Sequence, residues 1–147
     1  MLTIKRGNIF DSKCQTITNP VNCAGVMGAG LAFQFKNKYP EMFQVYNIAC
    51  HEGKIKPGFP FVYTAEDCKS KILLFPTKDH WKNPSKIEYI SDGMDRFVEK
   101  YEEWGITSIA FPTLGCGYGG LSWGVVGPIM TERLRKLPIQ TEIYLPK

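Results

Sequence analysis

Two glycine-rich segments of the chain have the composition of phosphate-binding loops. The first follows Asn19 and ends in Gly25-Val26-Met27-Gly28-Ala29-Gly30, and the second is Gly115-Cys116-Gly117-Tyr118-Gly119-Gly120. Glycine lets the main chain approach a phosphate closely, and a helix that begins after the loop adds unpaired N–H donors and a favourable dipole. Two such loops fit a diphosphate better than one, so we expect a phosphate-bearing, nucleotide-like ligand. A tight turn without a ligand is the alternative for the first loop.

The second segment also matches a dinucleotide-binding pattern. Gly115, Gly117 and Gly120 have the spacing G-x-G-x-x-G. Only one further βα unit is predicted beyond this point, whereas that fingerprint belongs near the start of a longer βαβ unit. We therefore do not expect a dinucleotide-dependent dehydrogenase.

Three polar side chains near these loops are candidates for contact with a sugar. Asn19 and Asn22 flank the first loop, and their carboxamides can hydrogen-bond to hydroxyl groups or stabilise the turn itself. Lys78 follows a predicted buried strand. It can act as a counter-charge to phosphate or, after desolvation, as a nucleophile toward a sugar carbon, and a solvated loop lysine is the alternative.

The segment after Lys78 is both basic and aromatic. His80, Trp81 and Lys82, with Lys86 nearby, can stack a base and contact phosphates, as proteins do when they bind single-stranded nucleic acid. A tryptophan that packs on the following helix explains the same residues.

The hydrophobic periodicity predicts the elements that position these residues. Strands are expected over residues 2–5, 15–18, 59–64, 71–75, 106–111 and 140–145, and helices over 28–39, 41–51, 84–104 and 122–137. Pro20 and Pro76 are expected to end the second and fourth strands. Strands separated by helices indicate an α/β fold with a mixed, largely parallel sheet, helices on both faces and ligands at the carboxyl ends of the strands.

The composition indicates one domain, residues 1–147, with 44% hydrophobic residues and a net charge of +4. No apolar stretch approaches the roughly 20 residues of a membrane span, and the N-terminal residues lack the apolar core of a secretory signal. Five cysteines without a C-x-x-C pair and two distant histidines favour neither a metal site nor a disulfide framework. We expect a cytoplasmic protein.

Several motifs together resemble the macrodomain family over essentially the whole chain. They are Gly7-Asn8-Ile9, Asn19-Pro20-Val21-Asn22, the segment from Gly25 to Lys36, and the segment from Pro112 to Leu121. Within the family, the first glycine loop followed by Phe33-Gln34-Phe35-Lys36, combined with Phe75-Pro76-Thr77-Lys78-Asp79-His80-Trp81, is most similar to DNA ADP-ribosyl glycohydrolase antitoxins of the DarG type.

This resemblance implies a three-layer α/β/α fold and ADP-ribose as ligand or product, with no cofactor and no metal. Adenine is expected near Asn8 and Ile9, the diphosphate between the two glycine loops, and the distal ribose near the catalytic residues Lys78 and Asn22. The residues expected to bind ADP-ribose are Asn8, Ile9, Asn19, Gly25, Val26, Met27, Gly28, Gly30, Thr113, Gly115, Cys116, Gly117 and Tyr118.

The implied activity is removal of ADP-ribose from a nucleobase in single-stranded DNA. His80, Trp81 and Lys82 are then candidates for DNA contact, and a cognate DNA ADP-ribosyltransferase toxin is a further expected partner. A module that binds ADP-ribose without cleaving it, and a hydrolase of ADP-ribosylated protein or ADP-ribose 1″-phosphate, are the alternatives. The chain differs from these relatives at two places. Many macrodomains carry aspartate at the position of Asn8, and related hydrolases that act on protein carry an aspartate in the loop that matches residues 117–121, where this chain has none.

Overall fold

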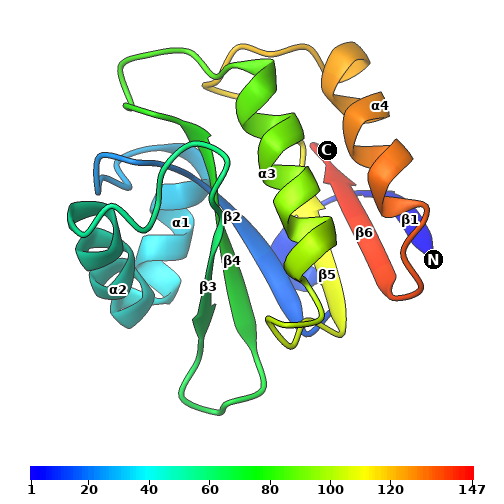
Figure 1. Ribbon diagram of the computed structural model, residues 1–147, viewed down its shortest axis with the longest axis horizontal. Helices are drawn as coiled ribbons and strands as arrows, with labels where there is room; N and C mark the ends of the chain where they lie inside the picture. Colours follow the sequence, from blue (N-terminus) through cyan, green and yellow to red (C-terminus); the bar gives the residue numbers. More distant parts are fainter.

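A six-stranded sheet forms the middle layer of the computed structural model, which describes residues 1–147 (Figure 1). Its strands are β1 (Leu2–Arg6), β2 (Thr16–Asn22), β3 (Phe61–Thr64), β4 (Lys71–Lys78), β5 (Ser108–Pro112) and β6 (Gln140–Leu145). The order across the sheet is β1-β6-β5-β2-β4-β3, and all neighbours are parallel except β3, which is antiparallel to β4. The predicted mixed, largely parallel sheet is confirmed.

Helices cover both faces of this sheet. They are the 3₁₀ helix η1 (Ile9–Asp11), α1 (Gly30–Lys38), α2 (Pro40–His51), α3 (Ile87–Lys100) and α4 (Trp123–Leu134). Figure 1 shows α3 and α4 in front of the sheet, while α1 and α2 pack against the opposite face. The architecture is therefore the predicted three-layer α/β/α arrangement. None of the helices combines the length and apolar composition needed to cross a membrane.

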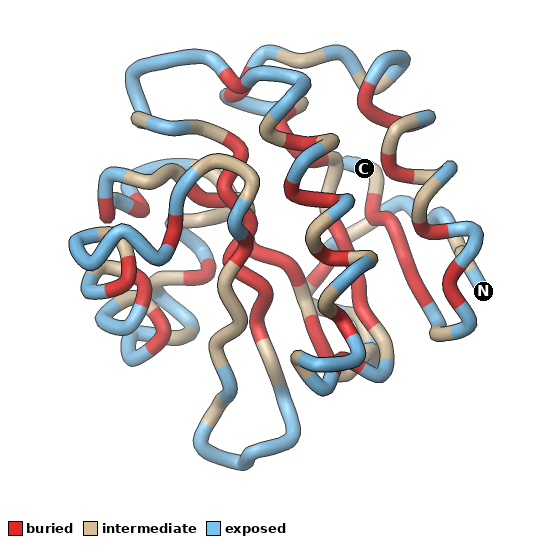
Figure 2. The backbone as a smooth tube through the Cα atoms, in the orientation of Figure 1, coloured by how far each residue is buried: buried red, intermediate tan, exposed pale blue.

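Strand β4 shows why the sheet needs helices on both faces. Its run Ile72-Leu73-Leu74-Phe75 is buried throughout, and successive side chains point to opposite faces of the sheet. Leu73 and Phe75 join the cluster under α3 and α4, whereas Ile72 and Leu74 join the cluster under α1 and α2. In Figure 2 the buried residues accordingly follow the strands and the inner sides of the helices.

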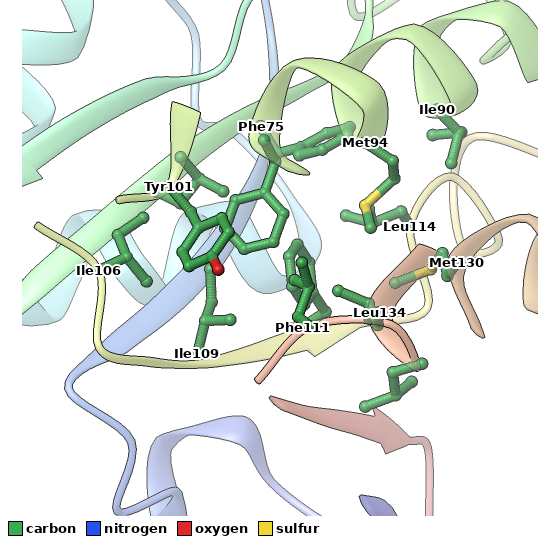
Figure 3. Packing of buried hydrophobic residues seen from close by; sticks show 14 of the residues in the cluster. Phe75, Ile90, Met94, Tyr101, Ile106, Ile109, Phe111, Leu114, Met130 and Leu134 are labelled. Carbon is green, nitrogen blue, oxygen red and sulfur yellow. The ribbon is translucent and has the colours of Figure 1, made fainter. Parts of the chain in front are cut away.

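Helix α3 lies very close to the end of β4. Ile90, Met94 and Phe97 recur at helical spacing and enter the core. Figure 3 shows Ile90 and Met94 there with Phe75 and Phe111. The rings of Phe97 and Phe111 meet edge to face, with their centres 5.3 Å apart. A Cβ atom at Gly93 would overlap the ring of Phe75. This close approach holds the middle of α3 against β4.

The two prolines expected to end strands lie inside them. β2 continues past Pro20 to Asn22, and β4 continues past Pro76 to Lys78. β2 pairs with β5 only at Thr16 and Ile17, and the pairing of β4 with β3 stops at Leu74, so each proline lies where its strand has one neighbour instead of two. A proline is tolerated there because its missing N–H can face the unpaired side. Asn22 and Lys78 therefore belong to strand ends.

Four helix boundaries differ from the prediction by two residues or more. α1 begins at Gly30 instead of residue 28, because Ala29 is still extended, and α3 begins at Ile87 instead of residue 84, because Lys86 is extended. α3 also ends at Lys100, four residues before the predicted end, and α4 ends at Leu134, three residues before it. The first two shifts lengthen the loops that precede the helices.

A buried carboxylate ties η1 to the far edge of the sheet. Glu142 of β6 accepts hydrogen bonds from the Ser12 hydroxyl at 2.6 Å and pairs with the Lys5 ammonium at 2.8 Å. Burial by itself raises the pKa of Glu142, but the hydrogen bonds from Lys5, Ser12 and Cys14 outweigh it and hold the pKa below its ordinary value. The charged form is therefore favoured in the folded protein.

Replacing Glu142 by Gln should lower the free energy of unfolding at pH 7 by about 1–2 kcal/mol, because charge-assisted hydrogen bonds to the carboxylate are lost. The folded pKa of Glu142 is depressed, so its contribution is present above the unfolded pKa and disappears as the pH falls through the folded pKa. Urea unfolding at pH 7 and near pH 3 should show a larger gap between variant and wild type at the higher pH. An equal gap at both pH values would contradict the role of the charge.

Candidate functional site

A pocket of about 920 Å³ opens at the carboxyl ends of the central strands. β2 and β5 are neighbours at Thr16 and Ile17 only, and past that point they separate. From β2 the chain continues toward β3 and β4, and from β5 it continues toward β6 in the opposite direction. The strand order therefore reverses here, which makes this a topological switch point, where α/β proteins bind ligands. The volume lies within the usual range for small-molecule sites.

The structure brings most of the predicted site residues to this pocket. Those that line it are Asn8, Ile9, Asn22, Val26, Met27, Gly28, Gly30, Lys78, Trp81, Thr113, Gly115, Gly117 and Tyr118. Predicted residues that do not line it are Asn19, Gly25, His80, Lys82 and Cys116. No aspartate or glutamate lines the pocket, whereas two lysines, Lys78 and Lys147, do.

The side chain of Asn22 organises the first glycine loop. Its Oδ1 accepts hydrogen bonds from the Ala24 N–H and the Tyr46 hydroxyl at 2.9 and 2.8 Å, and its Nδ2 donates to the Val26 carbonyl at 2.7 Å. Burial raises the pKa of Tyr46, so its hydroxyl stays protonated and remains a donor. Asn22 thus holds the loop at the mouth of the pocket, and its catalytic role stays a prediction.

The second glycine loop is closed by its own backbone. The Leu121 N–H donates to the Gly115 carbonyl at 2.9 Å, and Gly115 has a φ of +74°, which favours glycine. A Cβ atom at Gly119 would overlap both the Gly115 carbonyl and the Ser85 hydroxyl, so this position requires glycine too. By contrast, Gly117 faces open space toward the pocket.

The two loops meet across the pocket at Tyr118. A Cβ atom at Gly30, where φ is +59°, would lie only 2.9 Å from Cε2 of the Tyr118 ring. The ring of Tyr118 therefore rests against the start of α1, although the residue is 77% exposed. The loops, which are far apart in the sequence, enclose one site, as the sequence predicted.

A third segment, residues 79–85, links the two loops. At one end the Cys23 N–H donates to the Asp79 carbonyl at 3.0 Å, and at the other the Ser85 N–H donates to the Gly119 carbonyl at 3.0 Å. Lys78 immediately precedes this segment, and its Nζ donates to the Trp81 carbonyl at 3.3 Å. The position of the Lys78 amine is thus tied to both glycine loops.

Trp81 is a half-exposed side chain at the rim of the pocket. The His80 ring lies 5.3 Å from the Trp81 ring at an angle of 30°, and the Lys82 Nζ lies 5.3 Å from the centre of that ring. His80 and Lys82 do not reach the pocket and instead pack against Trp81. Together they form an aromatic and cationic surface next to Lys78.

The ligand contact expected for Asn19 is corrected by the structure. Asn19 is completely buried, and its Nδ2 lies 3.7 Å from Sδ of Met27 and 3.8 Å from Sδ of Met42. Because β2 continues through this position and helices cover both faces of the sheet, Asn19 lies in the interior, on the side of α1 and α2. Its contact with Met27, which lines the pocket, makes it a support for the first loop.

Gly25 and Cys116 also lie behind the surface of the pocket. The Gly25 carbonyl accepts a hydrogen bond from Nδ2 of Asn47 at 3.1 Å, on the side of α2. The Cys116 thiol donates to the Leu114 carbonyl at 3.5 Å and packs against the core under α3 and α4. Both residues shape their loops without lining the pocket.

Sequence reasoning missed the contribution of the last strand. Tyr144, Pro146 and Lys147 line the pocket beside Asn8 and Ile9. The Asn8 Oδ1 accepts a hydrogen bond from the Phe10 N–H at 2.9 Å and caps η1. The position of β6 between β1 and β5 brings its carboxyl end to the pocket, and this strand order was not predicted from the sequence. No group of three or more His, Cys, Asp or Glu side chains is placed to hold a metal ion.

Comparison with known proteins places this fold and site in a class. The Macro domain family model matches residues 18–130, and the chain belongs to this family. The macrodomain of Mycobacterium tuberculosis DarG has a TM-score of 0.95 at 39% identity, with 100% of this chain and 99% of that chain covered. Thermosipho africanus DarTG in complex with ADP-ribose has a TM-score of 0.93 at 44% identity, with 99% of this chain and 41% of that chain covered.

Curated relatives point in the same direction. The DNA ADP-ribosyl transferase-DNA ADP-ribosyl glycohydrolase fusion protein of Thermosipho africanus is 41% identical over 162 residues, and the DNA ADP-ribosyl glycohydrolase of Mycobacterium tuberculosis is 40% identical over 149 residues. Each alignment covers 99% of this chain. The chain spans about 42% of the length of these relatives.

Burial makes the cysteines near the loops poor nucleophiles. It raises the pKa of Cys23 to about 12, helped by the nearby Cys50 and Asp79, and it also raises the pKa of Cys116. At pH 8 about one Cys23 thiol in ten thousand is ionised. We therefore expect iodoacetamide to modify the exposed Cys68 first and to modify the half-buried Cys23 and Cys116 much more slowly, with faster modification after unfolding in urea.

Peptide mapping by mass spectrometry at intervals after mixing measures this order. The variant Cys68→Ser is the control and should lose the fast phase. Modification of Cys23 at the rate of Cys68 in the folded protein would contradict the partial burial and the raised pKa of the Cys23 thiol.

Proposed function

We propose that this macro domain is a DNA ADP-ribosyl glycohydrolase, which removes ADP-ribose from a nucleobase in single-stranded DNA. The observation that carries the proposal is the position of Lys78: an amine at the end of β4 that lines the same pocket as the two glycine-rich loops. The identity of about 40% with named DNA ADP-ribosyl glycohydrolases over 99% of the chain supports the same activity.

The proposed pose of ADP-ribose follows the shape of the pocket. Adenine lies at the end lined by Asn8 and Ile9, and the distal ribose lies at the end lined by Asn22 and Lys78. The diphosphate lies between the two loops, where backbone N–H groups and the start of α1 favour an anion. The absence of carboxylates from the lining supports a ligand with two negative charges.

Lys78 acts on the anomeric carbon of the distal ribose in this proposal. As a nucleophile, the neutral amine forms a C–N bond to that carbon while the bond to the nucleobase breaks, and the base takes up, through water, the proton that the attacking amine loses. The sugar ring then opens to an imine, which water hydrolyses to free ADP-ribose and the amine. As an ammonium, Lys78 instead polarises the anomeric centre while water forms the new C–O bond, the bond to the base breaks and one proton of that water passes to the base.

The surface around Trp81 receives the DNA. Trp81 lines the pocket together with Lys78, and Lys82 and His80 pack against its ring. A base next to the modified nucleotide can stack on the Trp81 ring while a DNA phosphate contacts Lys82. A DNA ADP-ribosyltransferase is the proposed source of the modified DNA, as the fusion of both named activities in the Thermosipho africanus relative suggests. Reversal of this modification is a form of DNA repair. It would make the protein an antitoxin against the transferase, and it fits a cytoplasmic location.

Replacing Lys78 by Ala should lower kcat on an ADP-ribosylated oligonucleotide by about 100-fold or more, because the group that acts on the anomeric carbon is lost. The affinity for free ADP-ribose, measured by calorimetry, should change much less. Lys136→Ala removes an exposed lysine outside the pocket and serves as the control. Unchanged turnover by the Lys78 variant would refute the assigned chemistry.

The same assay separates the alternatives. Borohydride added during turnover should reduce the imine and leave a covalent adduct on Lys78, whereas polarisation leaves none. Tight ADP-ribose binding without turnover on DNA, protein or ADP-ribose 1″-phosphate would instead identify a binding module, and faster turnover of protein or phosphate substrates would identify a different hydrolase.

Gly117 tests the position of the diphosphate. It lines the pocket without a positive φ, and a Cβ atom there meets nothing within 4 Å, so Gly117→Glu should fold normally. The added carboxylate should weaken ADP-ribose binding by about ten-fold or more through charge repulsion, whereas Gly117→Gln, which has the same size, should weaken it less. Calorimetry gives both affinities. Wild-type affinity in both variants would place the diphosphate elsewhere.

A further inference from the structure

A second cavity, of about 460 Å³, lies between the segment 53–62 and helix α3. Its lining includes three cations, Lys54, Lys56 and Arg96, and three aromatic residues, Phe59, Phe61 and Trp104. No acidic residue is part of the lining. This composition differs from an ordinary surface groove, where charges of both signs are mixed.

A tight turn builds the cationic side of this cavity. In the sequence Lys56-Pro57-Gly58-Phe59, the Phe59 N–H donates to the Lys56 carbonyl at 2.9 Å, and Gly58 has a φ of +84°. Proline followed by glycine in the left-handed region is typical of a type II turn. The turn brings the side chains of Lys56 and Phe59 together at the start of the segment that leads into β3.

The turn packs directly on α3. A Cβ atom at Gly58 would lie 3.3 Å from Cβ of Asp92, and Arg96 follows Asp92 by one helical turn. Arg96 therefore reaches the same aromatic ring as Lys56: its Cζ lies 4.6 Å from the centre of the Phe59 ring, and the Lys56 Nζ also lies 4.6 Å from it. Two elements distant in sequence thus converge on one ring.

The two cations on this ring lack a carboxylate partner. Neither Lys56 nor Arg96 takes part in an ion pair, although Asp92 lies beside the turn, and only Lys54 is paired, with Glu52 at 3.1 Å. Because each cation lies 4.6 Å from the centre of the Phe59 ring, the two positive charges are close enough to repel each other. The attraction of each cation to the ring offsets this repulsion only partly. A bound anion would relieve the repulsion, so the arrangement is poised to bind one.

The position of the cavity relates it to the first pocket. Phe61, which lines the cavity, pairs with Leu74 of β4, four residues before Lys78. This separation is about 13 Å along the strand, or roughly four stacked nucleotides. In Figure 1 the segment before β3 and the segment after β4 lie at the same end of the sheet.

We propose that this second cavity binds a nucleotide of the same single DNA strand that carries the modified base. Lys56 and Arg96 contact a phosphate, and the aromatic side chains accept a base, a combination by which proteins hold single strands without reading their sequence. The inference rests on the proposed function because it takes DNA as the substrate. It adds an anchoring site that extends contact beyond the modified nucleotide.

The test compares two double variants with equal loss of charge. Lys56→Gln with Arg96→Gln removes the proposed phosphate contacts, and Arg135→Gln with Lys136→Gln removes two exposed cations beyond α4 that line neither cavity. Fluorescence anisotropy with an unmodified labelled single strand of about twelve nucleotides gives the affinity at several salt concentrations. Thermal melting checks that both variants are folded.

We expect the Lys56 and Arg96 variant to bind the strand about ten-fold more weakly at physiological salt, and its plot of log K against log salt to be less steep by about 1.4. The control variant should keep the wild-type affinity and slope, and both should keep the wild-type affinity for ADP-ribose. Equal losses in the two double variants, or a parallel loss of ADP-ribose affinity, would overturn the second site.

Measurements of turnover distinguish a failure of the second site from a failure of the proposed function. With a modified strand, the Lys56 and Arg96 variant should show a higher KM and a similar kcat, while a modified mononucleotide should be cleaved at the wild-type rate. If wild type cleaves no modified DNA, the proposed function fails, and the anisotropy measurement still decides whether the second cavity holds a strand. A variant that loses kcat on the mononucleotide would overturn the anchoring role.

Discussion

The separation of β2 and β5 is the constraint on which the rest of this structure depends. These central neighbours are paired at Thr16 and Ile17 and then part, which opens a cleft in the middle of the sheet. The cleft receives the loops that follow both strands, so two segments almost a hundred residues apart in sequence face each other. A sheet paired to its end at this position would leave no room for a ligand between them.

The parting of the strands also exposes backbone that other groups must satisfy. Past Ile17, β2 has a neighbouring strand on one side only, so its backbone groups on the other side need other partners. Pro20 lacks an N–H and therefore leaves one donor fewer without a partner. Beyond Val21 the Asn22 carboxamide takes over, since it binds the Ala24 N–H and the Val26 carbonyl. The loop is thus prearranged before any ligand binds, which reduces the entropy that binding would have to overcome.

Much of this organisation could be predicted from the sequence because its signals are local. The fully apolar run of β4 and the helical spacing of Ile90, Met94 and Phe97 depend on neighbouring residues alone. The prolines gave the wrong strand ends because tolerance of a proline depends on whether the strand has one neighbour or two, and the pairing partners lie far away in the sequence. The contact predicted for Asn19 was wrong for the same reason. The strand was expected to end before Asn19, but β2 continues to Asn22, and Asn19 is therefore buried in the core.

The distribution of charge explains more than the net charge of +4. The carboxylate nearest the interior, Glu142, is neutralised by Lys5, and Asp95 is paired with Arg133 at 2.6 Å, so neither contributes strongly to the field at the pockets. The linings of both cavities contain cations and no carboxylates. A modest excess of charge is therefore concentrated where an anion can approach, and the proposed DNA strand, with a phosphate at every nucleotide, would meet both places.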